Sequence, residues 1–163
     1  MSRSKIVGMM ALIAFVVGIA LVSHAGAGEK IKCREVSYVT KFEQINVGDE
    51  KGHVIALVEA KGIYSNREGK TFCEGWLHWE AGLLNIDSKT GMTGNGYLIL
   101  TDKDGDKLYM KWNTNPSGPN PWTFYKGTGK FEGIKGEGTW SSVHYSDPSV
   151  FYVDLEGEVE LPR

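Results

Sequence analysis

The sequence predicts an all-β fold: a single antiparallel eight-stranded barrel that follows an N-terminal export signal. Three observations support this prediction. Apolar and polar residues alternate with a period of two in most of the chain after residue 27, as in strands with one buried face. Clusters of turn-forming residues separate the alternating runs. Glycine is frequent, with 21 of 163 residues, and lies inside or beside the runs, where barrel strands bend or bulge.

Residues 1–27 have the pattern of a secretory signal, and residues 28–163 are the expected barrel domain. A positive start at Arg3 and Lys5 precedes an uncharged, mostly apolar run over residues 6–22, and small-x-Ala cleavage patterns follow it. The run is long for a signal and short for a membrane span, so an uncleaved anchor is the alternative. We therefore expect a secreted or periplasmic protein.

The composition is that of a globular protein with a slightly acidic surface. Hydrophobic residues make up 41% and charged residues 23% of the chain, and the formal net charge is −2. Removal of the signal would remove two basic residues and no acidic one, which makes the remainder more acidic. This balance argues against nucleic acid as a partner, and against a membrane as a partner of the mature chain unless the signal persists as an anchor.

The chain contains two cysteines, Cys33 and Cys73. In an exported protein an even pair predicts a disulfide. Two free buried thiols are the alternative, and no CxxC spacing supports a metal pair.

The first four expected strands differ in pattern. In the first two, which contain Val36 and Ile55, apolar residues recur at every second position. In the third, both faces carry apolar residues, and the fourth is a short, fully apolar run. Gly48-Asp49 and two further turn clusters separate them. The four ranges are 36–42, 53–60, 72–80 and 97–100.

The last four expected strands end with the clearest one. Over residues 151–161, apolar side chains alternate with Asp154 and three glutamates, which predicts an apolar inner face and an acidic outer face. Asp104-Gly105 and two Pro-containing segments supply the turns. The other three ranges are 108–112, 122–125 and 139–145.

One segment carries a family resemblance. Residues 127–139 read GTGKFEGIKGEGT, and residues 101–106 before them read TDKDGD. This pattern resembles the late hairpin of the allene-oxide-cyclase-like barrel proteins, a calycin-like group that also resembles dirigent proteins. Residues 52–57 are similar to an early strand of exported members of this group. The resemblance implies a calycin-like barrel in which residues 127–139 join two neighbouring strands.

The same resemblance implies no particular activity. The wider group includes cyclases that fold a reactive lipid in an apolar cavity and proteins that guide radical coupling without a cofactor. No catalytic motif of those enzymes matches this sequence residue by residue. The glycines do not predict a phosphate loop, because the segment after Gly138 is strand-like rather than helical.

An acidic cluster and the histidines were weighed as metal sites. Asp102, Asp104 and Asp106 resemble part of a calcium loop, but the Gly and Glu of that loop are missing and no helix flanks it, so we expect an exposed hairpin turn. His53, His78 and His144 come from three strands and could meet inside a barrel to bind zinc, but no spacing supports this. We expect no metal and no cofactor.

The strand over residues 72–80 carries the candidate catalytic residues. Glu74, His78 and Glu80 share one face, where a carboxylate near an imidazole could serve acid–base chemistry if that face points inward. The opposite face, with Leu77 and Trp79, is at least as apolar, so the pattern slightly favours an outward His78.

The aromatic residues are the candidate ligand contacts. Five tryptophans and seven tyrosines could line a cavity or fill the barrel as ordinary core. The candidates for the cavity wall are Trp76, Trp112, Trp122 and Phe124.

We therefore expect an exported barrel that binds a small apolar or aromatic ligand without a cofactor. The first alternative is a cofactor-free isomerase or cyclase in the same cavity, and the second is a structural or adhesion protein of the envelope with no pocket. The sequence leaves the oligomeric state open.

Overall fold

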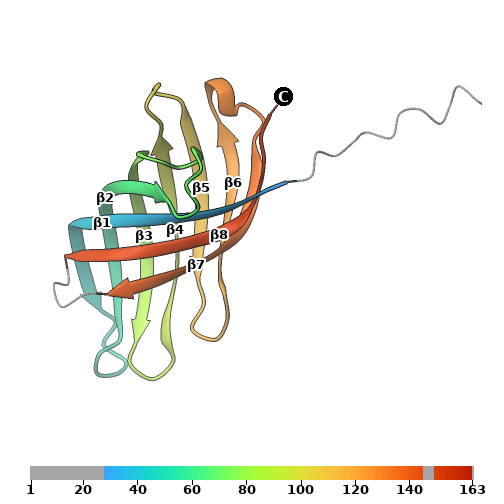
Figure 1. The fold of residues 1–163 in the computed structure, drawn as a ribbon. Helices are drawn as coiled ribbons and strands as arrows, with labels where there is room; N and C mark the ends of the chain where they lie inside the picture. The colour runs from blue at the N-terminus through green and yellow to red at the C-terminus, as the bar shows by residue number, and fades with distance from the viewer. Residues whose placement is uncertain (1–27, 145–148, 163) are drawn as a thin grey trace, which may run out of the picture.

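The computed structural model describes residues 28–144 and 149–162, so the predicted signal over residues 1–27 lies outside the described residues. The described chain forms eight antiparallel strands, each paired with the next, and the last strand pairs with the first to close a barrel (Figure 1). This confirms the predicted fold class. The elements are β1 (Glu29–Asn46), β2 (Val54–Asn66), β3 (Leu77–Asp87), β4 (Gly91–Thr101), β5 (Lys107–Thr114), β6 (Asn120–Gly127), the short 3-10 helix η2 (Gly129–Phe131), β7 (Lys135–His144) and β8 (Val150–Glu160). In the described part of the chain, no helix has the length and apolar character needed to cross a membrane.

The long strand β1 changes its inward face at a bulge. Before the bulge, its odd-numbered residues are buried, among them Ile31, Cys33 and Glu35. The pairing with β2 shifts between Val39 and Lys41, which inserts one unpaired residue. A strand alternates with a period of two, so this single insertion exchanges the two faces beyond it. In Figure 1, β1, β7 and β8 cross the steeper strands β3 to β6.

One expected strand begins later than predicted. Residues 72–80 alternate like a strand, but β3 starts only at Leu77. Cys73 and Gly75 have positive φ angles of 61° and 70°, which extended backbone cannot accommodate. Residues 72–76 therefore form a turn that folds over one end of the barrel. The acidic outer face predicted for β8 is confirmed, with Val153 and Leu155 buried and Glu156 exposed.

Glycine pairs on neighbouring strands make room for indole rings inside the barrel. Gly82 and Gly96 face each other across β3 and β4, and a Cβ atom at either position would overlap the ring of Trp112. Gly138 and Gly157 face each other across β7 and β8, and a Cβ atom there would overlap the ring of Trp122. Glycine at these positions therefore leaves the space that the two indole rings occupy.

One end of the barrel is filled and closed. The ring of Phe72 packs 4.7 Å from that of Trp76, which in turn lies 5.2 Å from Phe131 of η2. The predicted disulfide Cys33–Cys73 is present and ties β1 to the turn over residues 72–76, with 6.4 Å between the Cα atoms. The buried side chains at this end are Ile31, Cys33, Phe72, Cys73, Trp76, Leu100, Leu108, Phe124, Phe131 and Ile134.

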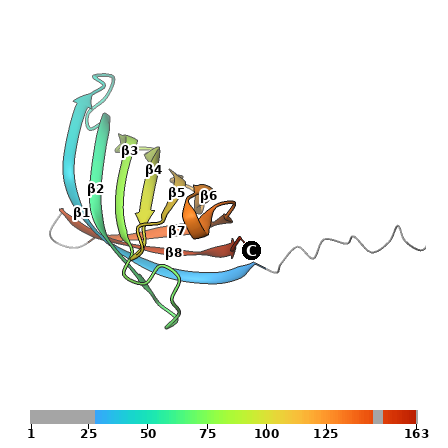
Figure 2. The ribbon, with the colours of Figure 1, turned by 90° about the horizontal axis from the view of Figure 1, so that it is seen from above.

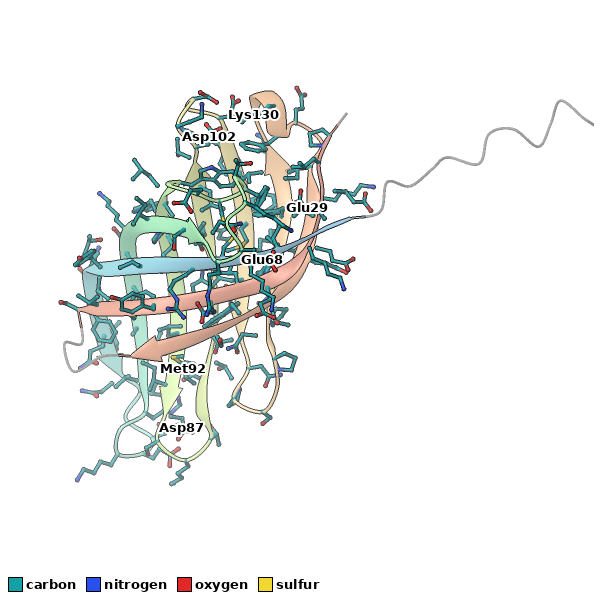
Figure 3. All side chains as sticks on the ribbon, in the orientation of Figure 1. Glu29, Glu68, Asp87, Met92, Asp102 and Lys130 are labelled. Atoms are coloured by element: carbon teal, nitrogen blue, oxygen red, sulfur yellow. A yellow bond between two sulfur atoms is a disulfide. The ribbon has the colours of Figure 1, made fainter. Side chains whose placement is uncertain are left out.

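The opposite end carries the turns between β1 and β2, β3 and β4, and β5 and β6. Figure 3 shows the two ends: Asp102 and Lys130 mark the closed end, while Asp87 and Met92 mark the other. Viewed along a perpendicular direction, β2 to β6 form one gently curved wall (Figure 2). The candidate site lies inside the barrel, between this wall and the strands β7, β8 and β1.

Candidate functional site

A cavity of about 670 Å³ occupies the half of the barrel away from the closed end. Its wall is mainly apolar, and its volume lies within the range of small-molecule sites. Glu35, Tyr64 and Glu80 contribute the polar groups deepest in the barrel. The remaining wall residues include Val39, Phe42, Val58, Leu84, Ile86, Met92, Leu98, Met110, Trp112, Thr114, Trp140, Ser142, Phe151, Val153 and Leu155.

Of the four aromatic residues predicted as ligand contacts, the structure places only Trp112 in the cavity wall. Trp76, Trp122 and Phe124 lie in the packed core. The ring of Trp122 rests on the glycine pair of β7 and β8 and 5.0 Å from the ring of Phe124, while its indole N–H donates to the carbonyl of Thr139. The wall also contains Trp140 of β7, one of the five tryptophans considered for it but not one of the four candidates, and Phe151 of β8, which was not predicted.

His78 points into the barrel, against the expectation from the sequence pattern. Its side chain is buried, while Leu77 is 61% and Trp79 is 37% exposed. The pattern misled because the inner face of β3 is the less apolar one: next to His78 it carries Glu80 and Gly82, the latter lying under the indole ring of Trp112. An inner face that lines a cavity beside polar groups need not be the more hydrophobic face.

Glu74 is separated from the other two candidate catalytic residues. It lies in the turn before β3, is exposed, and its carboxylate accepts a hydrogen bond of 2.7 Å from the backbone N–H of Asn66. The positive φ of Gly75 breaks the alternation that placed Glu74 on the face of His78. Its geometry is that of a turn residue, so it has no contact with the cavity.

Glu35 of β1 is the centre of a buried hydrogen-bond network. One carboxylate oxygen accepts a hydrogen bond from the Ser37 hydroxyl and the other accepts one from the Tyr64 hydroxyl. Nε2 of His78 lies 3.2 Å from Oε1 of Glu35 and 3.1 Å from Oγ of Ser37. Because the Ser37 hydroxyl donates to Glu35, Nε2 of His78 acts as a donor towards Ser37 and Glu35.

The network keeps Glu35 ionised. Burial raises the pKa of Glu35, but hydrogen bonding and charge attraction from His78, together with hydrogen bonds from Ser37 and Tyr64, lower it below its usual value. The same negative charge acts on Tyr64, whose pKa is raised well above 10 by burial, by the charge of Glu35 and by the hydrogen bond to it. Tyr64 thus remains a hydrogen-bond donor at any physiological pH.

The pKa of Glu80 is shifted in the opposite direction. Burial, followed by repulsion from Glu35, raises the pKa of Glu80 well above its usual value. Among the described residues no hydrogen bond offsets either effect, so the carboxyl group that faces the apolar cavity is shifted towards its neutral form. When two neighbouring carboxyl groups have pKa values shifted in opposite directions, one can act as an acid and the other as a base in the same site.

The cluster of Glu35, His78 and Glu80 is close enough to be considered as a metal site. One ligand atom from each lies within 4.8 Å of the others. However, each oxygen of Glu35 already accepts a hydrogen bond from Ser37 or Tyr64. The donor set is therefore organised around protons rather than around a cation.

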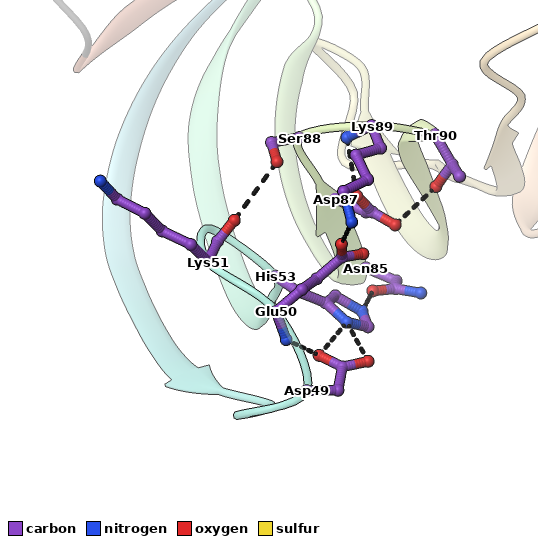
Figure 4. Close-up of polar contacts among 9 residues, drawn as sticks. All are labelled: Asp49, Glu50, Lys51, His53, Asn85, Asp87, Ser88, Lys89 and Thr90. Carbon is purple, nitrogen blue, oxygen red and sulfur yellow. Dashed lines mark hydrogen bonds and ion pairs between the residues drawn. The ribbon is translucent and has the colours of Figure 1, made fainter.

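His53 lies at a turn rather than near His78. Its Nδ1 is 2.7 Å from Asp49 and its Nε2 is 2.7 Å from Asn85 (Figure 4). His78 lies beside its strand partner Gly62. Gly62 follows His53 by nine residues, which corresponds to about 30 Å of extended chain between the two histidines. The zinc arrangement of three histidines is thus not formed by His53 and His78.

The remaining candidate metal ligands are His144 and the aspartate cluster over residues 102–106. The side chain of His144 lies outside the described part of the structure. Asp102 accepts hydrogen bonds from the backbone N–H groups of Asp104 and Asp106, and Lys130 pairs with Asp102 and Asp104. These contacts match the hairpin turn that the sequence predicted.

The barrel is similar in structure to solved dirigent proteins. Over 85% of this chain and 99% of the other, it superposes on the pterocarpan synthase dirigent protein PsPTS1 with a TM-score of 0.53 and 10% identity. The pterocarpan synthase dirigent protein GePTS1 superposes with a TM-score of 0.49 and 12% identity, over 87% of this chain and 95% of the other. The chain has a dirigent-like barrel fold. The resemblance in residues 127–139 is consistent with it, because that segment joins the adjacent strands β6 and β7.

The sequence itself matches no protein-family model and no curated protein. Because the identity to the solved dirigent proteins is low, the likeness concerns the fold alone.

Proposed function

We propose that the protein is an exported barrel that binds a small, mainly apolar ligand in its cavity without a cofactor. The observation that carries this proposal is the cavity of about 670 Å³, whose mainly apolar wall includes the carboxyl group of Glu80. The cavity runs against the hypothesis of an envelope protein with no pocket. The disulfide supports a location outside the reducing cytoplasm.

The polar groups of the cavity suggest which end of the ligand is polar. Glu80 offers a proton, and the indole N–H of Trp112 is buried without a hydrogen-bond partner among the described residues. Both groups are donors. A ligand that brings an uncharged acceptor, such as a carbonyl or ether oxygen, would satisfy a donor that is otherwise costly to bury.

A neutral fluorescent dye tests whether the cavity binds. Nile red is apolar and carries a carbonyl group, so its emission should increase when the exported protein is added. Val58→Trp places an indole in the cavity wall and should abolish this increase, whereas Val47→Trp, in the exposed turn after β1, should leave it unchanged. Equal binding by all three proteins would place the dye on the surface and contradict the proposal.

The arrangement of Glu35 and Glu80 favours a second candidate, a cofactor-free isomerase or cyclase. A neutral acid in an apolar cavity can protonate a bound oxygen, and a nearby ionised carboxylate can hold the charges that develop. Dirigent proteins with this barrel include pterocarpan synthases, so the fold admits chemistry as well as binding.

Mass spectrometry of co-purified molecules separates the two candidates. Wild-type protein and Glu80→Gln are isolated from the same exporting cells, and the small molecules released on denaturation are identified. A binder yields the same molecule from both proteins. An enzyme yields different molecules, because the variant retains a substrate that the wild type converts.

A further inference from the structure

Three strands, β1, β2 and β3, supply the ionisable side chains of the cavity wall. Glu35, Tyr64 and Glu80 lie deep in the barrel, and Lys41 follows the bulge of β1. The ammonium group of Lys41 is 3.3 Å from the carboxylate of Glu43, so its charge is already paired. In the described part of the chain, the wall residues from β4, β5, β7 and β8 carry no titratable group. Proton binding inside the cavity therefore concerns the three deep residues.

Hydrogen bonds reach one of the two deep carboxyl groups and not the other. The oxygens of Glu35 accept hydrogen bonds from Ser37 and Tyr64, and Nε2 of His78 lies 3.2 Å from one of them. Among the described residues, none donates a hydrogen bond to Glu80, although its side chain lines the cavity. The solvation of the Glu80 carboxyl group therefore depends on what fills the cavity.

The two protonation states of Glu80 differ in how they tolerate a ligand. An ionised carboxylate needs hydrogen-bond donors, which water inside a cavity can supply. A mainly apolar ligand displaces this water, so its binding penalises the ionised form, and repulsion from the charge of Glu35 grows as the local dielectric constant falls. A protonated carboxyl group costs less to desolvate and donates one hydrogen bond to an acceptor on the ligand. Filling the cavity therefore favours protonated Glu80.

We propose that the protein binds its ligand together with one proton at Glu80, and that ionisation of Glu80 releases the ligand. The inference rests on the proposed function, because it concerns the same cavity and a ligand of the same chemistry. The coupling is reciprocal: the factor by which the ligand strengthens proton binding at Glu80 is the factor by which the proton strengthens ligand binding. Burial and the charge of Glu35 raise the pKa of Glu80, so release begins above the pH at which ordinary carboxyl groups ionise. The cavity thus takes up its ligand in acidic surroundings and releases it in alkaline ones.

The test is the dissociation constant of Nile red, measured between about pH 5 and about pH 9, where ordinary carboxyl groups are mostly ionised. The dye itself is uncharged under these conditions. For the wild type, the dissociation constant should stay constant at the acidic end and then increase by up to about tenfold for each pH unit. In Glu80→Gln it should stay low throughout, because the amide donates a hydrogen bond at every pH. Glu160→Gln, a matched change on the outer side of β8, should follow the wild type.

A further variant tests the part played by Glu35. Glu35→Gln removes the repelling charge, so the increase in the dissociation constant should begin at a lower pH than in the wild type. Melting temperatures verify that each variant is folded, and the comparison of wild type with Glu80→Gln decides the inference if Glu35→Gln is not. Equal pH profiles of wild type and Glu80→Gln, or a wild-type affinity that increases with pH, would overturn the inference and leave the proposed function standing. Absence of dye binding at every pH would contradict the proposed function and the inference with it.

Discussion

Replacing Glu80 by glutamine should stabilise the protein at neutral pH and should lose this benefit in acid. Glu80 lies in the cavity wall next to Glu35, whose carboxylate is ionised. Burial and the charge of Glu35 raise the pKa of Glu80 well above 4.5. Glutamine has nearly the same shape and carries no charge at any pH, so the substitution removes the titration and little else.

The sign of the effect follows from proton linkage. A carboxyl group whose pKa is raised in the folded state contributes stability below its unfolded-state pKa, and this contribution is lost as the pH rises towards the folded-state pKa. Above pH 4.5 the unfolded chain ionises Glu80 while the folded chain keeps it protonated. Relative to Glu80→Gln, the wild type should therefore lose about 1.4 kcal/mol for each pH unit above that point, up to the folded-state pKa.

Urea denaturation at several pH values between about 4 and about 8 measures this difference. Other groups titrate in both proteins, among them Asp49 and His53, so their contributions cancel when the two curves are subtracted. Glu160→Gln is the matched control for the chemical change itself, because Glu160 is exposed on the outer side of β8, away from the cavity.

A difference between wild type and Glu80→Gln that stays constant over this range would refute the reasoning. It would mean that Glu80 is ionised in the folded protein, and the assignment of a neutral acid to the cavity would fail with it. The proposed protonation role would then lose its physical basis, although ligand binding would not.

Two other predictions concern the framework of the barrel. Gly96→Ala should destabilise the fold by about 1–3 kcal/mol in chemical denaturation, because its methyl group would overlap the ring of Trp112; the stabilisation by up to about 1 kcal/mol that alanine gives at a tolerant glycine site would contradict this packing. The double variant Cys33→Ser/Cys73→Ser should lower the free energy of unfolding by about 2–5 kcal/mol, because the disulfide closes a loop with a sequence separation of 40 residues; equal unfolding midpoints of the two proteins would refute it.

The fold was predictable because it depends on features that are local in sequence. Alternation with a period of two gives the strands, and in β8 the acidic residues leave no doubt about the outer face. Turn residues separate the strands, and the predicted export signal was the reason to expect a disulfide between the two cysteines. Several predicted ranges were shorter than the strands, since β1 begins at Glu29 and β4 at Gly91. The strand predicted over residues 72–76 is a turn, because the backbone angles of Cys73 and Gly75 are not visible in an alternating pattern.

The site was harder to predict because it depends on which face of each strand is inside. In β3 both faces are partly apolar, and the outer one carries Leu77, Trp79 and Leu83, which are exposed on the outside of the barrel. Because apolar residues lie on both faces of β3, the sequence pattern does not indicate which face points into the barrel. Glu35 was missed for a related reason: it comes from β1, far from His78 in sequence, and only the closed barrel brings them together.

The position of the buried network argues for a function rather than for stability. Glu35 and His78 are ionisable groups inside a barrel that is otherwise packed with apolar side chains. Apolar side chains of similar volume at such positions are often as stabilising or more so. The network also lies where the filled core ends and the cavity begins, and burial together with the charge of Glu35 raises the pKa of Glu80 in the cavity wall. A core that served stability alone would gain nothing from this arrangement, whereas a cavity that must donate a hydrogen bond or a proton to an apolar ligand requires it.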